Sequence, residues 1–269
     1  MATRPLPRTR DRGTWAQPAP IARRRKRFRW LRRLFKLGIV LTILAVGAWI
    51  YLMQIYAPGL RTEARQIPAL VNAQLAQQSA PYTPGSNISP YLKEAIVAIE
   101  DRRFYSHPGV DPLGMVRALW VNVTQQHVDQ GGSTLEQQLV KRTLVSNDRD
   151  IHGKLRSIAL AWAVDQDFSK ARIIELYLNA AYYGQGAYGA AEASRVYFGT
   201  DAAHLTLPQA AFLAALPQAP SVYGANPTGA AIRARQQRVL LDMEQLGSIS
   251  PAELQAAART PLTFSLPNP

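Results

Sequence analysis

The sequence predicts a mostly α-helical protein, in which one N-terminal transmembrane helix precedes a large helical domain. Three observations predict this class. Residues 37–55 form a nearly uninterrupted apolar run, about as long as a helix that spans a bilayer. From about residue 58 onward, helix-start signals recur and period-two alternation of β-branched residues is scarce. An apolar content of 47% in 269 residues is ample for a packed core.

The first 36 residues contain most of the excess positive charge. They hold thirteen of the 31 lysines and arginines and only one of the 18 acidic residues, so residues 37–269 are almost neutral. We expect a disordered, basic cytoplasmic tail, and the rest of the chain gives no indication of nucleic-acid binding. The Lys/Arg cluster at residues 23–36 abuts the apolar run, and such positive flanks stay on the cytoplasmic side.

The apolar run is interpreted as an uncleaved, single-pass anchor in the cytoplasmic membrane. A signal peptide is the alternative, but the basic region is long and no Ala-x-Ala-like site follows the run directly. Everything beyond residue 57 should then be periplasmic or otherwise extracytoplasmic. The chain has no cysteine, so its outward part must rely on a packed core instead of disulfides. We expect a linker over residues 56–84 and the main domain over residues 85–269.

Helix signals divide this main domain. Ser89-Pro90 combines a cap residue with a proline suited to the first turn, and Asp111-Pro112 repeats this combination for a helix through about residue 125. Ser133 with Glu136, and Ser250 with Glu253, match the capping-box spacing and open two more helices. The other helices are expected near residues 153–166, 169–178, 208–216 and 227–246, the last closed by Gly247.

The segment AIEDRRFYSHPGVD, residues 98–111, places Glu100 and Asp101 at the end of an apolar helix, before a polar and aromatic loop. A carboxylate at such an edge can be desolvated on one side, which makes it a better general base. Taken alone, a Glu-Asp pair at a helix end is more often a solvated surface feature. These residues by themselves leave both interpretations open.

The segment GGSTLEQQLVKR, residues 131–142, leads two glycines into a capped helix. Backbone N–H groups at a helix start, together with Lys141 and Arg142, would suit a diphosphate group. A flexible turn before an ordinary helix is the alternative, and the residues alone do not decide between them.

These two segments resemble the first and second conserved motifs of the family 51 glycosyltransferases, the peptidoglycan glycosyltransferases also found in class A penicillin-binding proteins. Further similar stretches extend over residues 169–199 and 205–227, so the resemblance covers roughly residues 85–245. It implies a lysozyme-like, two-lobed helical domain. It also implies polymerisation of lipid II into glycan strands, by inverting transfer with loss of undecaprenyl diphosphate.

The resemblance also implies roles for individual residues. Glu100 would be the general base that deprotonates the acceptor 4-hydroxyl, and Asp101 would join it in the catalytic centre. Such a single displacement needs no nucleophilic side chain. The residues expected to shape the site or to hold the donor are Phe104, His107, Ser133, Thr134, Gln138, Lys141, Arg142 and Lys154. A divalent cation, Mg²⁺ or Mn²⁺, would assist, and the partners would be lipid II, the growing strand, the membrane and cell-wall synthesis proteins.

One stretch departs from the family pattern. The third family motif reads Arg-Lys-x-x-Glu, whereas this chain has Gly153 in place of the arginine and Ser157 in place of the second catalytic glutamate. A serine cannot supply the charge that organises a metal or water beside a diphosphate. Glu136, where the family usually has a small polar residue, is interpreted as part of the capping box, with compensation for the lost carboxylate as the alternative.

Three functions follow from these residues. A working glycosyltransferase is expected first, because the other motifs are intact. A catalytically impaired protein that binds lipid II or serves as a scaffold is the alternative, because of Ser157. A lysozyme-like hydrolase is the third. The Ser-x-x-Lys and Lys-Thr-Gly elements of penicillin-reactive domains do not occur, so the protein should be monofunctional.

Overall fold

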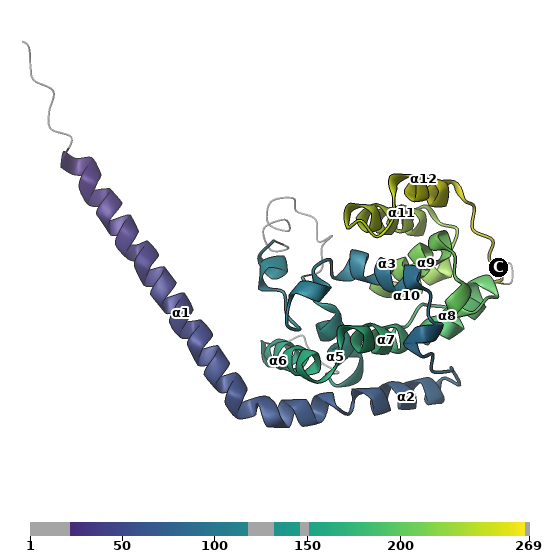
Figure 1. Ribbon diagram of the computed structural model, residues 1–269, viewed down its shortest axis with the longest axis horizontal. Coiled ribbons are helices and arrows are strands. Elements are labelled where there is room, and N and C mark those ends of the chain that lie inside the picture. Colours follow the sequence, from purple (N-terminus) through teal and green to yellow (C-terminus); the bar gives the residue numbers. More distant parts are fainter. Residues whose placement is uncertain (1–21, 118–131, 146–150, 267–269) are drawn as a thin grey trace, which may run out of the picture. The chain divides into compact units, whose positions relative to one another are not determined.

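The computed structural model describes residues 22–117, 132–145 and 151–266 (Figure 1). The chain divides into two compact units, Met1–Gln54 and Ile55–Pro269. The described residues are mainly helical, and their one β element is an isolated bridge between Tyr182 and Tyr188. The prediction of a mostly α-helical protein is confirmed.

The helices vary in length from a single turn to the 43 residues of α1. The α-helices are α1 (Ala22–Ala64), α2 (Ile67–Gln77), α3 (Pro90–Glu100), α5 (Leu135–Thr143), α6 (Ile151–Asp167), α7 (Lys170–Ala180), α8 (Gly189–Phe198), α9 (Leu207–Ala215), α10 (Pro220–Ala225), α11 (Ala230–Gln245) and α12 (Pro251–Arg259). The 3₁₀ turns are η1 (Gly85–Asn87), η2 (Phe104–Ser106), η3 (Ala202–His204) and η4 (Leu216–Gln218). Residues 112–117 are also helical, and the rest of the helix predicted to continue to residue 125 lies outside the described residues.

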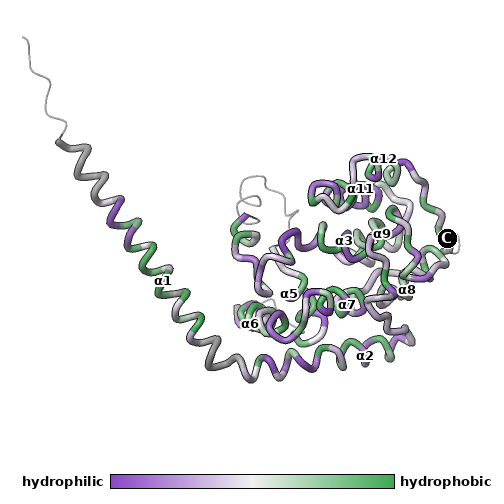
Figure 2. The backbone as a smooth tube through the Cα atoms, viewed as in Figure 1, coloured by the Kyte–Doolittle hydropathy of each residue, from purple (hydrophilic) through white to green (hydrophobic). Residues whose placement is uncertain are grey.

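The first unit contains most of α1. Figure 2 shows mainly hydrophobic residues along the middle of this helix, and side chains there such as Leu37, Leu41 and Leu44 are exposed. Within the described residues, no helix meets the length and hydropathy that crossing a membrane requires. The membrane span predicted over residues 37–55 stays a prediction.

The second unit packs its helices in two groups. In one group α3, α9 and α11 contact one another, and α12 adds to α11. In the other, α5 packs against α6 and α7, and α7 also contacts α2 and α8. Within this unit, Figure 1 shows the first group above α5, α6 and α7. The end of α3 and the start of α5 bring residues of the two groups together.

Residues 67–77, inside the segment expected to be a linker, form α2. Ile67, Val71 and Leu75 recur every fourth residue, which places them on one face of a helix. All three are buried in the core, and α2 packs against α7. The second unit therefore uses this segment as part of its packed structure.

Local signals set several helix ends. Ser250 and Glu253 form the predicted capping box at the start of α12, and the Ser250 N–H donates to Glu253 Oε2 at 2.7 Å. Gly247 follows α11 with a φ of +74°, as expected for a glycine that ends a helix. Ser89 precedes α3 but does not cap it, because its hydroxyl donates to the Leu205 carbonyl instead.

Candidate active site

Glu100 is the last residue of α3, and its side chain is 14% exposed. Gln138 on α5 donates from Nε2 to Glu100 Oε2 at 2.7 Å. The Tyr177 hydroxyl in turn donates to Gln138 Oε1 at 3.2 Å. Glu100 Oε1 has no hydrogen-bond partner in the described structure, although Arg235 Nη2 lies 3.5 Å away. The carboxylate is thus held on one side by a neutral amide and faces a cation on the other.

Asp101 is buried directly behind Glu100. Its two carboxylate oxygens each lie 3.0 Å from His107 Nε2, and the Leu135 N–H at the start of α5 donates to Oδ2 at 3.1 Å. A carboxylate at a helix N-terminus is favoured by the helix dipole. Asp101 therefore joins the loop after α3 to the first turn of α5, which brings the first and second sequence motifs together.

His107 is buried between charged groups. Burial, the largest influence, lowers the pKa of His107, but the hydrogen bond and charge of Asp101 and the charge of Glu136 outweigh it, so the pKa is raised above 6.5. The Phe104 ring packs edge-on to the imidazole and is fully buried. Phe104 and His107 therefore fix the loop after Glu100.

Gly109 allows this loop to approach α6. Its φ is +81°, and a Cβ at this position would lie 2.3 Å from the Ala161 carbonyl oxygen, so a side chain cannot fit without a backbone shift. The Gly109 carbonyl accepts a hydrogen bond of 2.7 Å from the Thr134 hydroxyl. The loop is thereby clamped between α5 and α6.

The capping box predicted for Ser133 and Glu136 is wrong by one residue. Thr134 is the cap of α5, and its partner is Gln137: the Gln137 N–H donates to Thr134 Oγ1 at 3.3 Å, and the Thr134 N–H donates to Gln137 Oε1 at 3.0 Å. Because the helix starts one residue later than expected, Glu136 falls in the first turn and points inward. Its side chain is completely buried.

Lys170, the first residue of α7, neutralises Glu136. Its ammonium lies 2.7 Å from Glu136 Oε1 and 2.7 Å from Asp165 Oδ1, and it also donates to the His107 carbonyl at 2.9 Å. The same ammonium lies 4.4 Å from the centre of the Phe104 ring. Sequence reasoning missed Lys170 and Asp165, although both lie in or beside the 169–199 stretch that resembles the family.

The buried residues Asp101, His107 and Glu136 offer three ligand atoms within 4.8 Å of one another. In the described structure, His107 Nδ1 and Glu136 Oε2 have no hydrogen-bond partner, as unfilled metal ligands would. However, the Lys170 ammonium already balances Glu136, and Mg²⁺ usually keeps several of its waters. This enclosed cluster therefore fits a lysine-neutralised network better than hydrated Mg²⁺ or Mn²⁺, and the predicted cation stays a prediction.

The groups expected to hold a diphosphate lie along α5 and α6. At the start of α5, the Leu135 and Gln137 N–H groups are already paired with Asp101 and Thr134, which leaves fewer amides for a phosphate than the sequence suggested. The other predicted binding residues are placed as follows: Ser133 is half-buried before α5, Lys141 and Arg142 are half-buried near its end, and Lys154 is exposed on α6. Gly131 lies outside the described residues.

Ser157, which is expected to replace the second glutamate of the family motif, is fully buried on α6. Its hydroxyl donates to the Lys154 carbonyl one turn earlier in the same helix, at 2.8 Å. The side chain is therefore used within α6 and supplies no charge.

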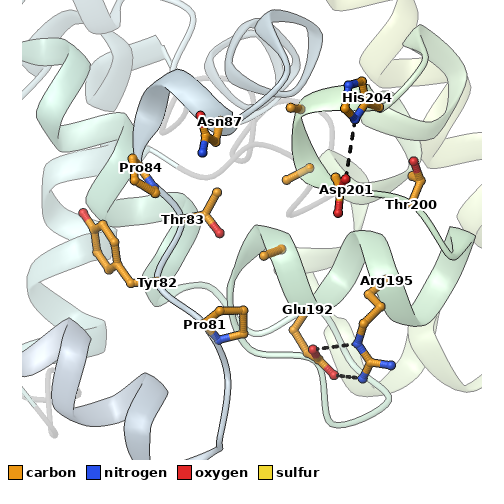
Figure 3. Close-up of a pocket in the computed structure, with 13 residues that line it drawn as sticks. Pro81, Tyr82, Thr83, Pro84, Asn87, Glu192, Arg195, Thr200, Asp201 and His204 are labelled. Carbon is orange, nitrogen blue, oxygen red and sulfur yellow. Dashed lines mark hydrogen bonds and ion pairs between the residues drawn. The ribbon is translucent and has the colours of Figure 1, made fainter.

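A separate pocket of about 500 Å³ lies between the segment before α3 and α8 with η3, and none of the predicted site residues lines it (Figure 3). Its charged side chains pair with one another: Arg195 Nε donates to Glu192 at 3.1 Å, and His204 lies 3.6 Å from Asp201. These groups are largely satisfied, so the Glu100 region is the better candidate for chemistry.

Comparison with known proteins gives a consistent result. A protein of Cupriavidus necator named “putative transglycosylase” is 39% identical over 236 residues, which are 86% of this chain and 99% of that protein. Penicillin-binding protein 1A of Aquifex aeolicus is 37% identical over 246 residues, 86% of this chain, and the match spans about a third (34%) of that protein. A crystal structure of penicillin-binding protein 1A from Haemophilus influenzae matches 37% of this chain and 15% of that chain, with 37% identity and a TM-score of 0.34.

A family model described as transglycosylase matches residues 68–244. This range includes Glu100, the Asp101–His107 pair, α5 and Lys170. Because the model matches most of the chain and the Cupriavidus protein is similar along nearly its whole length, this chain belongs to the transglycosylase family of peptidoglycan biosynthesis.

Proposed function

We propose that this protein polymerises lipid II into glycan strands by inverting glycosyl transfer with loss of undecaprenyl diphosphate. The observation that supports this most directly is the Glu100 carboxylate, which is oriented by Gln138 and backed by the buried Asp101–His107 pair. A general base needs a fixed carboxylate within reach of the hydroxyl that it deprotonates. Glu100 meets the first requirement, and its side chain, 14% exposed, lies at the edge of the core.

In the proposed reaction Glu100 accepts the proton of the acceptor sugar's 4-hydroxyl. The acceptor oxygen forms a bond to the anomeric carbon of the donor, while the bond between that carbon and the diphosphate oxygen breaks. Undecaprenyl diphosphate leaves with the bonding electrons. No covalent intermediate with the protein is needed, so this chemistry requires no nucleophilic side chain.

Cationic side chains on α5 are suited to the departing diphosphate. The Arg142 guanidinium lies 5.3 Å from the centre of the buried Tyr177 ring, which fixes its position near Gln138. Preorganised charges of this kind stabilise the negative charge that develops on a leaving group. Lys141 on the same helix and Lys154 on α6 are proposed to assist.

A binding or scaffold function is the second candidate, and Ser157 is the observation that favours it. The buried serine hydroxyl is committed to its own helix, so the second catalytic carboxylate of the family motif has no replacement at this position. A protein of this kind would retain lipid II without converting it.

Polymerisation of purified lipid II by the detergent-solubilised full chain tests the proposal. We expect glycan from the wild type and a loss of at least about 100-fold in Glu100→Gln, because general-base catalysis typically contributes 10²–10⁴-fold. Glu94→Gln is the matched control, since Glu94 is an exposed carboxylate on the same helix. Glycan synthesis that persists in Glu100→Gln, or is lost equally in Glu94→Gln, would reject Glu100 as the base.

We also propose that residues 37–55 anchor the protein in the cytoplasmic membrane, with residues 1–36 on the cytoplasmic side and the residues beyond 57 on the outer side. The length of the apolar run and its basic flank support this orientation. We expect the full chain to stay with membranes after alkaline carbonate extraction, and protease added to the outer face to digest residues beyond 57. Release of the full chain by carbonate would contradict the anchor.

A further inference from the structure

The pocket of about 500 Å³ beside α8 plays no part in the proposed chemistry (Figure 3). Residues 81–84 and Asn87 form one of its walls, and α8 with η3 forms the other. The two walls are joined at the start of α3. There the Ser89 N–H donates to the Ala202 carbonyl at 2.8 Å, and the Ser89 hydroxyl donates to the Leu205 carbonyl at 3.2 Å. The pocket is therefore a fixed hollow of the second unit.

The wall at residues 81–84 has little free backbone to offer a ligand. Pro81 and Pro84 have no N–H group. The Thr83 N–H donates to Asn179 Oδ1 at 2.8 Å, and the Thr83 carbonyl accepts from Asn179 Nδ2 at 2.8 Å. An extended peptide cannot add to this wall as a further strand, because strand addition depends on free main-chain N–H and C=O groups. Recognition in this pocket must therefore come from side chains.

Charged side chains of both signs line the pocket (Figure 3). On α8, Arg195 Nε donates to Glu192 Oε2 at 3.1 Å, and the Arg195 side chain is 69% exposed. At η3, His204 Nδ1 lies 3.6 Å from Asp201 Oδ2, and both side chains are exposed. Exposed ion pairs of this kind contribute little to stability. A ligand can therefore take the place of one partner in such a pair with little loss of stability.

The lining of the pocket indicates which class of ligand it suits. Its apolar residues on α8 and η3 are three alanines, which give a lipid chain little surface to contact. The two carboxylates, Glu192 and Asp201, disfavour a polyanion such as a nucleic acid. A ligand that has both an ammonium and a carboxylate can pair with these carboxylates and with Arg195 at the same time.

We propose that this pocket binds the peptide stem of a muropeptide. This inference rests on the proposed function, in which lipid II and the growing strand both carry such stems. The stem has carboxylates and, on its diamino acid, a free amino group. A carboxylate of the stem pairs with the planar guanidinium of Arg195, while the ammonium pairs with Glu192 and Asp201. Glu192 and Arg195 thereby exchange each other for groups of the ligand, and neither charge is left without a partner.

The pocket is within reach of the proposed reaction. It lies at the start of α3, and Glu100 is the last residue of that helix. An α-helix rises about 1.5 Å per residue, so the 11 residues of α3 are roughly 16 Å long. An extended peptide spans about 3.3–3.6 Å per residue. A stem of about five residues, attached to a sugar near Glu100, therefore covers this distance.

Binding of a free stem peptide tests the pocket without turnover. The probe is the synthetic peptide L-Ala-γ-D-Glu-meso-diaminopimelyl-D-Ala-D-Ala, titrated into the detergent-solubilised full chain and followed by calorimetry. We expect the wild type to bind it, and the Kd to be about tenfold higher in Arg195→Gln and in Glu192→Gln, because each variant loses one charge-assisted pair. Arg259→Gln is the control, since Arg259 is exposed on α12 and does not line the pocket. A wild type that does not bind the peptide, or equal binding by all variants, would overturn the proposal.

A further variant tests the shape of the pocket. Ala203 is an exposed residue of its lining, so Ala203→Trp adds a large ring without removing a charge. We expect this ring to occupy the pocket and to raise the Kd for the peptide by about tenfold or more. Circular dichroism and thermal unfolding of each full-length variant establish that it is folded. Unchanged binding by a folded Ala203→Trp variant would also overturn the proposal, because the peptide would then bind elsewhere.

Polymerisation kinetics separate this site from the proposed function. Lipid II with a complete stem is compared with lipid II whose stem is cut back to its first residue. In Arg195→Gln we expect the KM for the complete substrate to rise several-fold with little change in kcat, and the KM for the truncated substrate to stay as in the wild type. An equal rise with both substrates would overturn the proposal. If the wild type makes no glycan but its peptide binding is lost in Arg195→Gln, the proposed function fails while the peptide site stands.

Discussion

Glu100 and Asp101 are adjacent in the sequence but have different surroundings. Glu100 is partly exposed at the end of α3, and its Oε1 has no hydrogen-bond partner in the described structure but lies 3.5 Å from Arg235 Nη2. Asp101 is buried and accepts from His107 and from the Leu135 N–H. Because Asp101 is buried and Glu100 is the more exposed of the two, we propose proton transfer for Glu100 and a positioning role for Asp101, which joins α5 to the loop after α3.

The raised pKa of His107 predicts a pH-dependent contribution to stability. Because its pKa in the folded protein lies above the unfolded value of 6.5, the stabilisation is fully present below pH 6.5 and is lost as the pH rises through the folded value. We expect the difference in unfolding temperature between wild type and His107→Asn to shrink as the pH is raised from 6.5 into the alkaline range. A difference that is constant or grows over this range would contradict the Asp101–His107 ion pair.

The sequence alone could not decide which residue caps α5. Ser133 with Glu136, and Thr134 with Gln137, both match the capping-box spacing. The structure selects the second pair because Thr134 also bonds to the Gly109 carbonyl and the Leu135 N–H bonds to Asp101. Both contacts come from a loop more than twenty residues earlier, which no local pattern reveals.

At the scale of helices, Lys170 connects three of them. It begins α7, contacts Glu136 on α5 and Asp165 on α6, and bonds to the backbone of the loop at His107. Burial raises the pKa of Glu136, and the bond from Lys170 opposes this rise. The lysine therefore keeps charge balanced in a region from which water is largely excluded.

Removing Lys170 should be costly because it leaves Glu136 buried without its cation. We expect Lys170→Met to lower the free energy of unfolding by about 3 kcal/mol. The same change should cost less when Glu136 is replaced by leucine, since no buried charge is then left unpaired at that position. The exposed pair Glu192–Arg195 gives the control: Arg195→Met should cost much less, because an ion pair in solvent contributes little to stability. The free energies of unfolding are measured by denaturant titration. An equal loss in Lys170→Met and Arg195→Met would show that the buried Lys170–Glu136 pair stabilises the fold no more than an exposed pair does.

The helices differ in how far the sequence predicted them. Those with strong local signals, such as α3 after Ser89-Pro90 and α12 after Ser250, start where expected. The helix α2 lies in the segment expected to be a linker, although its Ile67, Val71 and Leu75 recur every fourth position. Its burial depends on α7, so its role is decided by tertiary packing.

For the whole molecule, the sequence predicted the helical class and the region around Glu100, but not its electrostatic partners. Gln138, which is expected to bind substrate, also contacts Glu100 directly, while Arg235 and Lys170 were not singled out at all. These residues lie 38, 135 and 34 positions away from the carboxylates that they contact. Contacts over such separations arise from the packing of α3, α5, α7 and α11.

The measurement that tests the central claim most directly is the stoichiometry of lipid II consumption by the full-length protein. Radiolabelled lipid II is incubated with the wild type, and undecaprenyl diphosphate release is compared with the number of disaccharides joined. We predict one molecule released for each linkage formed, and none in Glu100→Gln. Lipid II that binds to the wild type but stays intact would contradict the claim and would favour the binding function suggested by Ser157.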